Sequence, residues 1–333
     1  MAPDRFIRLV NQQAAVRNAL SQRIGALTQR LLASQKWSDW FSDDAVAKSA
    51  QQMAGFSRSG QQRTADTTAS YMDQVFAATR PGPPPPVTAG RTGVVLPDSL
   101  RGLDDPAEPW TRPAEQFRYA TSQGFPPEVA LDRAVQRAQQ LADDDLLLAQ
   151  RFAAQEKLTA EPKVIGYRRI LHPELAKTGS CGLCIAASTR RYYVEELMPI
   201  HGGCNCTQAP IYAESDPGDS LNLTDLSDLY KLAGSTAADK LKRVRVQVQQ
   251  HSELGPVLRE MGQNFQTKAD ADALQRKPGK RPLPDAAAAK VIQDRATQTL
   301  EELTAKWDAG DKALADPMAF HRELIARMAA LHQ

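Results

Sequence analysis

The sequence predicts a mainly α-helical protein with a small α+β core domain that carries a cluster of cysteine and histidine residues. Apolar residues recur at helical spacing near the start of the chain, where Val16, Leu20 and Ile24 share one face. Aromatic residues make up only 6% of the chain, which fits helices packed through alanine and leucine better than a β-sandwich. All four cysteines lie between Cys181 and Cys206, in a segment where we expect little regular structure.

Residues 1–80 form the first predicted unit, a helical region. Its apolar faces comprise Val16 to Leu31, Trp37 to Phe41, and Tyr71 to Thr79. The segment Arg80–Gly90 then contains four consecutive prolines, which lack the amide donor of a helix and clash with the preceding turn. We therefore expect residues 81–110 to form a stiff, extended spacer and a domain boundary.

The core domain is predicted to span residues 111–265. The expected helical runs are Thr111–Gln123, Pro126–Asp145, Leu146–Leu158 and Asn222–Gly234. The expected strands are Val164–Ile170, Thr207–Tyr212 and the alternating stretch around Val244, Val246 and Val248. A polar linker at 266–284 and a helical tail at 285–333, broken near Gly310, complete the predicted organisation.

Charge and hydropathy limit where the protein can act. The net charge of +2 does not commit the whole chain to nucleic acid, and its apolar runs are too short to span a bilayer, so we expect no membrane partner. The first 20 residues lack the continuous apolar stretch of a signal peptide. We therefore expect a reducing compartment, in which clustered cysteines favour a metal site over disulfides.

Two short motifs in the cysteine segment have the spacing of metal ligands. Cys181 and Cys184 form C-x-x-C, and His201 and Cys204 form H-x-x-C, with glycine inside each pair. Glycine allows the tight backbone turn that such a pair needs, and two pairs can complete a tetrahedral zinc site. Cys206 is a fifth candidate ligand. The predicted structural zinc therefore has either four cysteine ligands or three cysteines with His201, and spacing does not decide between these shells.

Other interpretations of the segment stay open. A Cys181–Cys184 disulfide would fit an oxidising site, and buried thiols can pack as small apolar groups. Nucleophilic catalysis would need a thiolate beside an imidazole, or a pair such as Ser188 and His172. However, a metal-bound thiolate is a poor nucleophile, and no G-x-S-x-G turn surrounds a serine. We therefore assign no catalytic residue and do not expect the cluster to be an enzyme active site.

The stretch CGLC…HGGCNCTQAPIY resembles the phage Mu F-like head morphogenesis family, also called minor capsid proteins. His201, Cys204, Cys206 and the strand ending at Tyr212 correspond to the end of that family's core domain. The preceding GYRRILHPELAKTGSCGLCIAAS and the later VQQHSELGPVLREMGQNF look like the version from tailed phages of actinobacteria. The resemblance covers roughly Val164 to Phe265. Asn205 departs from the pattern, because family members commonly have a basic residue between the last two cysteines.

The resemblance implies a component of the phage procapsid, located inside the virion head near the portal. Its implied partners are the portal protein, scaffold or major capsid protein, and packaged DNA, during assembly in the host cytoplasm. Relatives are often called capsid maturation proteases, so processing of capsid or scaffold protein is the alternative function. Two basic groups are weaker candidates for binding DNA phosphates, and each is also typical of a solvated surface: Lys242, Arg243 and Arg245, and Arg276, Lys277, Lys280 and Arg281.

The zinc interpretation predicts that Cys184→Ser releases metal and lowers the melting temperature. A structural zinc ion contributes on the order of 10 kcal/mol of apparent binding free energy, which the folded state loses with its ligand. The measurements are metal content and thermal unfolding of the purified chain. Purified parent protein without metal, together with an unchanged melting temperature in the variant, would contradict a structural metal.

Overall fold

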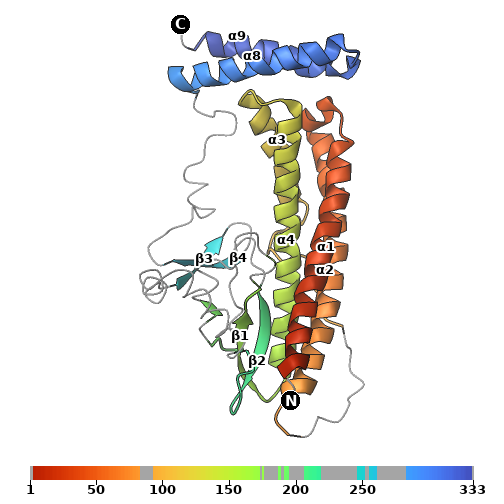
Figure 1. Ribbon diagram of the computed structural model, residues 1–333, viewed down its shortest axis with the longest axis vertical. Coiled ribbons are helices and arrows are strands. Elements are labelled where there is room, and N and C mark those ends of the chain that lie inside the picture. Colours follow the sequence, from red (N-terminus) through yellow and green to blue (C-terminus); the bar gives the residue numbers. More distant parts are fainter. Residues whose placement is uncertain are drawn as a thin grey trace. The chain divides into compact units, whose positions relative to one another are not determined.

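The computed structural model describes residues 3–82, 93–172, 175, 187–188, 191–194, 206–218, 246–251, 255–260 and 283–331 (Figure 1). Within these ranges the protein is mainly α-helical and contains two antiparallel two-stranded sheets. This confirms the predicted predominance of helices.

In the described residues, three long helices and three shorter ones precede the first sheet. In chain order they are α1 (Pro3–Ala33), the 3₁₀ helix η1 (Trp37–Phe41), α2 (Asp43–Thr79), the 3₁₀ helix η2 (Glu108–Thr111), α3 (Arg112–Ser122) and α4 (Pro127–Ala160). α2 ends at Thr79, directly before the proline-rich segment, most of which lies outside the described residues. Proline favours the first turn of a helix, and α4 starts at Pro127, one residue after the predicted start.

The strands and the C-terminal helices follow. They are β1 (Val164–Ile170), β2 (Thr207–Tyr212), β3 (Val246–His251), β4 (Gly255–Glu260), α8 (Ala286–Asp308), the 3₁₀ helix η4 (Lys312–Leu314) and α9 (Ala315–Ala329). The strands β1 and β2 confirm the two predicted strands, and β3 begins at Val246 of the predicted alternating stretch. The helical tail breaks around Gly310 as expected, where φ is +113°. The predicted helix Asn222–Gly234 and Val244 lie outside the described residues.

The chain forms two compact units, each built from three separate segments. Unit 1 comprises Met1–Arg23, Ser57–Pro106 and Ala142–Lys268, and unit 2 comprises Ile24–Phe56, Ala107–Leu141 and Ala269–Gln333. The helices α1, α2 and α4 each contribute residues to both units. These units are therefore not contiguous stretches of sequence, whereas the predicted domains are. Whether the predicted boundaries act as folding or cleavage boundaries stays a prediction.

The C-terminal half of α4 lies at the centre of unit 1. Its residues 144–151 are buried on every side of the helix, which is the pattern of a helix surrounded by other elements. The apolar core of unit 1 combines side chains from α1, α2, α4 and the β1–β2 sheet: Phe6, Leu9, Val10, Tyr71, Met72, Val75, Phe76, Ala154, Leu158, Tyr167, Ile170 and Ala209. Each large apolar side chain buried in such a core contributes roughly 1.5–3 kcal/mol.

An acidic triplet, Asp143 to Asp145, lies within α4 and not at a break between two helices. Asp145 accepts hydrogen bonds from Ser57 of α2 (2.5 Å) and from Nε of Arg101 (2.6 Å). Asp143 accepts a hydrogen bond from Ser21 of α1. Because these partners come from other parts of the chain, the aspartates stay inside a continuous helix. The prediction that Pro126–Asp145 and Leu146–Leu158 are separate runs is therefore wrong.

Unit 2 contains an aromatic cluster and a helical hairpin. Trp40 of η1 stacks on Phe117 of α3 with ring centroids 4.1 Å apart. Trp37 and Phe41 of η1 contact Phe320 of α9, with centroids 5.7 and 5.8 Å away. The hairpin of α8 and α9 has its own apolar core, formed by Ala289, Ile292, Ala296, Leu324 and Met328. No helix in the described part of the chain is long and apolar enough to cross a membrane.

The buried pair of Arg101 and Asp145 predicts a large effect of Arg101→Ala on stability. Both side chains are about 5% exposed, so the variant leaves a carboxylate in the interior without its guanidinium. We expect a loss of about 3 kcal/mol in the free energy of unfolding, measured by urea denaturation. Lys157→Ala is the control, because it removes an ion pair with Asp73 at the surface and should cost less than about 1 kcal/mol. Equal losses in the two variants would contradict a structural role for the buried pair.

Candidate functional site

The structure describes one of the five predicted metal ligands. Cys206 is buried, with 4% of its surface exposed, and directly precedes β2. The other four ligands, Cys181, Cys184, His201 and Cys204, lie outside the described residues, as do all seven basic residues predicted to contact DNA. Within the described ranges, no group of three or more histidine, cysteine or acidic side chains could hold a metal ion.

The sheet of β1 and β2 brings the two ends of the cysteine segment together. The two strands are antiparallel, and Ile170, the last residue of β1, pairs with Thr207, the first residue of β2. All residues between these two positions, including every cysteine, therefore belong to one segment whose two ends are neighbours in a ladder. Closing a loop of this length costs conformational entropy, and the ladder offsets that cost before any ligand is bound.

Side chains of the surrounding helices satisfy the outer edge of β2. The main-chain N–H and C=O of Tyr167 bond to Tyr192, on the side of β1 that faces away from β2. Tyr167 is paired with Pro210 of β2. The backbone groups of Pro210 therefore also point away from the other strand, β1. Cys206 and Gln208 share this outward orientation, since backbone groups alternate along an antiparallel strand. Nε2 of Gln150 in α4 donates to the carbonyl of Cys206 (3.0 Å).

Tyr71 and Pro210 complete the closure of this edge. The hydroxyl of Tyr71 in α2 donates to the carbonyl of Gln208 at 2.8 Å. Pro210 has no N–H and so presents no unsatisfied donor at the same edge. The backbone that follows Cys206 is thus held by two helices through side-chain bonds, and all six residues of β2 are buried.

A buried chain of hydrogen bonds joins Tyr71, Thr207 and His172. Burial raises the pKa of Tyr71 above its ordinary value, and a hydrogen bond from the Thr207 hydroxyl opposes this effect. Nε2 of His172 lies 3.0 Å from Oγ1 of Thr207, within hydrogen-bonding distance. The polar groups at the entry and the exit of the cysteine loop are therefore joined in one network.

Arg168 of β1 fixes another point of the cysteine loop. Its guanidinium binds Asp216 through two nitrogens, at 3.0 Å from Nε and 2.6 Å from Nη2, and both side chains are almost fully buried. Nη1 of the same group donates to the carbonyl of Ser188 at 3.1 Å. Arg191, which is mostly exposed, lies 3.3 Å from the same carboxylate. This charge-assisted network ties Ser188 to the sheet.

The residues weighed for serine catalysis are enclosed. Ser188 is 0% exposed and His172 is 3% exposed, so neither side chain reaches solvent or a bound polypeptide. The nucleophile of a hydrolase has to lie where the carbonyl carbon of a substrate can reach it. In this arrangement both residues support the fold, and the described residues offer no accessible nucleophile–base pair.

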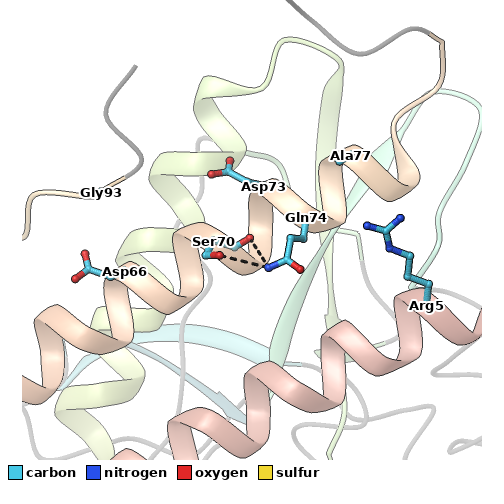
Figure 2. A pocket seen from close by; sticks show the side chains of 7 residues that line it. All are labelled: Arg5, Asp66, Ser70, Asp73, Gln74, Ala77 and Gly93. Carbon is cyan, nitrogen blue, oxygen red and sulfur yellow. Dashed lines mark hydrogen bonds between the residues drawn. The ribbon is translucent and has the colours of Figure 1, made fainter. Parts of the chain in front are cut away.

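A pocket of about 500 Å³ lies at the surface of unit 1 (Figure 2). Its lining comes from α2, the start of α1 and a single loop residue: Arg5, Asp66, Ser70, Asp73, Gln74, Ala77 and Gly93. The acidic side chains are engaged elsewhere, because Asp66 accepts from Gln62 at 2.9 Å and Asp73 pairs with Lys157. The lining includes neither histidine nor cysteine, so we assign no chemistry to this pocket.

Sequence reasoning missed the helix residues that hold β2. Gln150 lies in α4 one turn from the apolar residues Leu147 and Ala154 and is fully buried. A polar residue between buried apolar neighbours is the signal that could have identified it, because a buried amide has to find partners.

Comparisons with protein-family models, with curated proteins and with solved structures give no match for this chain.

The network around Tyr71 predicts how Tyr71→Phe alters the pH dependence of stability. The folded state keeps Tyr71 neutral, whereas the unfolded chain ionises it near pH 10, so the wild type loses stability as the pH rises above about 10. Tyr71→Phe should be less stable at pH 7 by roughly 1–2 kcal/mol, through the lost bond to Gln208. Its further loss at alkaline pH should be smaller than that of the wild type.

The measurement is urea denaturation of both proteins between pH 7 and 11. Part of the alkaline loss should persist in the variant, because burial also raises the pKa of Tyr212. Tyr119→Phe, at an exposed position of α3, is the control for loss of a phenolic hydroxyl at pH 7. Parallel pH profiles for wild type and Tyr71→Phe would contradict burial of a neutral phenol.

Proposed function

We propose that this protein is a phage minor capsid protein that acts by binding inside the procapsid, near the portal, and assists head assembly and DNA packaging or delivery. The sequence from Cys181 to Tyr212, with its resemblance to the Mu F-like family, is the basis of the proposal. Its partners are the portal protein and scaffold or major capsid protein, with packaged DNA as a further contact. The protein then works in the host cytoplasm during assembly and stays in the virion head.

The observation that carries a binding role is the enclosure of the candidate catalytic residues. Ser188 and His172 lie in the interior of unit 1, and each is bonded to another residue of the sheet. An enclosed serine and histidine support a fold-holding segment better than a protease active site. The alternative function, maturation proteolysis of capsid or scaffold protein, requires an active site elsewhere in the chain or a different conformation of this one.

The cysteine loop is proposed to hold a structural zinc ion. A buried thiol next to a strand that two helices fix suits a metal ligand, and Cys206, which directly precedes β2, meets that description. The proposed shell is either all four cysteines or three of the cysteines with His201, and Cys206 is one candidate ligand. Bound zinc would cross-link the loop, and the β1–β2 ladder would bring the two ends of the loop close enough to share it.

Deletion of the gene from the phage tests the role. Without the protein, heads should be malformed, underfilled or poorly infectious, while the major capsid protein keeps its wild-type length. The measurement is the intact mass of the capsid protein in wild-type and deletion heads. A longer, unprocessed capsid protein in the deletion alone would contradict a binding role and favour the protease.

Co-expression with the major capsid protein separates the two functions further. Ser188→Ala, His172→Ala and Cys181→Ala variants should leave the mass of the capsid protein unchanged. Because Ser188 and His172 are buried, circular dichroism must first show that these variants keep the helical content of the wild type. Trimming of the capsid protein that is present with wild type and lost in a folded variant would establish proteolysis.

A further inference from the structure

The hairpin of α8 and α9 has the properties of a separate module within unit 2. Its apolar core consists only of its own residues, with Ala296 of α8 and Leu324 of α9 at the centre. Asp285 caps the start of α8 by accepting a hydrogen bond from the amide of Ala288 at 2.8 Å. Separation of the hairpin from its neighbours would therefore leave this core and this cap in place.

The hairpin binds the corner between α3 and α4, which we define as Gln123–Phe125. Nη1 of Arg295 donates to the carbonyl of Gln123 (2.8 Å), and the hydroxyl of Thr299 donates to the carbonyl of Gly124 (2.8 Å). Nε2 of His321 lies 3.3 Å from the carbonyl of Phe125. Three consecutive carbonyl groups of the corner thus each contact one side chain of the hairpin.

The side chain of Phe125 strengthens the same contact. The guanidinium carbons of Arg133 in α4 and Arg295 in α8 each lie 4.0 Å from the centre of its ring. Such cation–π contacts orient charged groups over an aromatic face without needing an acidic partner. Arg295 therefore contributes twice, once to a carbonyl and once to the ring.

Gly124 makes the fit between corner and hairpin specific. Its φ of +78° is in the left-handed region, which glycine adopts most readily. A β-carbon at this position would lie 2.8 Å from the carbonyl oxygen of Ile292 and 2.9 Å from the amide nitrogen of Ala296. The backbones of corner and hairpin approach too closely for any other residue.

The connection to the hairpin is long. The segment between Glu260, the last residue of β4, and Ala286, the first of α8, contains about 25 residues, and a chain of that length reaches at most about 80–90 Å. The hairpin core stays intact on release. Exchange of a hairpin between two chains would break and remake the corner contacts, the ring contacts of Phe320 with η1, and the exposed ion pair of Lys306 with Glu128. Exchange of an identical element is a low-cost route to a dimer.

We propose that the corner is an interaction surface for the α8–α9 hairpin of a second copy of this chain, so that two copies pair by exchanging hairpins. A tethered hairpin reaches its own corner at an effective concentration on the order of 1 mM. The wild-type chain therefore pairs when its own concentration approaches that range, as in a confined assembly. Blocking the intramolecular contact should allow pairing at far lower concentration.

Two full-length variants provide the test. The corner variant, Gly124→Ala, keeps an intact hairpin but cannot receive one. The hairpin variant, Arg295→Ala with Thr299→Val, keeps an intact corner but cannot fill it. Mixed in equal amounts at about 100 µM, they should form a species of twice the 36.5 kDa chain mass in sedimentation velocity, whereas each alone stays at the chain mass.

Matched controls make the result specific. Thr297→Val changes an exposed threonine of α8 whose hydroxyl donates to the carbonyl of Gln293 in the same helix. The hairpin of this variant should still occupy the corner of its own chain. Mixing it with the corner variant should therefore give no species of twice the chain mass. Circular dichroism confirms that each variant is folded, and Phe125→Ala replaces the corner variant if Gly124→Ala loses helix. A mixture of folded variants that stays at the chain mass would overturn the proposal.

Discussion

The structure of unit 1 depends on how α2 and α4 satisfy the outer backbone groups of β2. Within the described residues β2 pairs only with β1, yet all six of its residues are buried. A buried strand edge without partners would cost free energy for each lost hydrogen bond. Gln150 and Tyr71 supply bonds to this edge, and Pro210 removes a donor that would otherwise need one. The short sheet can therefore be an interior element, and the loop that it closes is anchored at both ends.

Local sequence patterns predicted the elements but not their partners. Period and capping signals are properties of neighbouring residues, and they located β1, β2, the start of α4 and the break near Gly310. The predicted break between Asp145 and Leu146 is wrong, because partners from other parts of the chain satisfy Asp143 and Asp145 inside a continuous helix. The residues that satisfy Asp145, namely Ser57 and Arg101, lie 88 and 44 positions away, so no local pattern could reveal them.

At the candidate site, too, local patterns predicted the segment but not the distant residues that contact it. The spacing of the cysteines and His201 predicts a metal site in one segment, and this stays a prediction. The register of Ile170 with Thr207 shows that the two ends of that segment are paired. The groups that hold the exit of the loop come from α2 and α4, more than 50 residues away in sequence. Proline-rich and polar stretches likewise mark local breaks in the chain. They do not reveal that α1, α2 and α4 each contribute to two compact units.

The two units differ in the kind of polar contact that fixes their parts. In unit 1 the anchors are buried charges such as Asp145 with Arg101, where loss of one partner leaves a charge in the interior at a cost of about 3–5 kcal/mol. In unit 2 the hairpin is held partly by bonds from side chains to carbonyl groups, such as Thr299 to Gly124, each with a net contribution of about 1 kcal/mol. Both partners of such a bond are neutral, so losing it costs less than leaving a charge unpaired in the interior. The anchored ends of the cysteine segment in unit 1 are thus suited to a permanent structural role, and the hairpin to a contact that can break and re-form, as the proposed exchange between two copies requires.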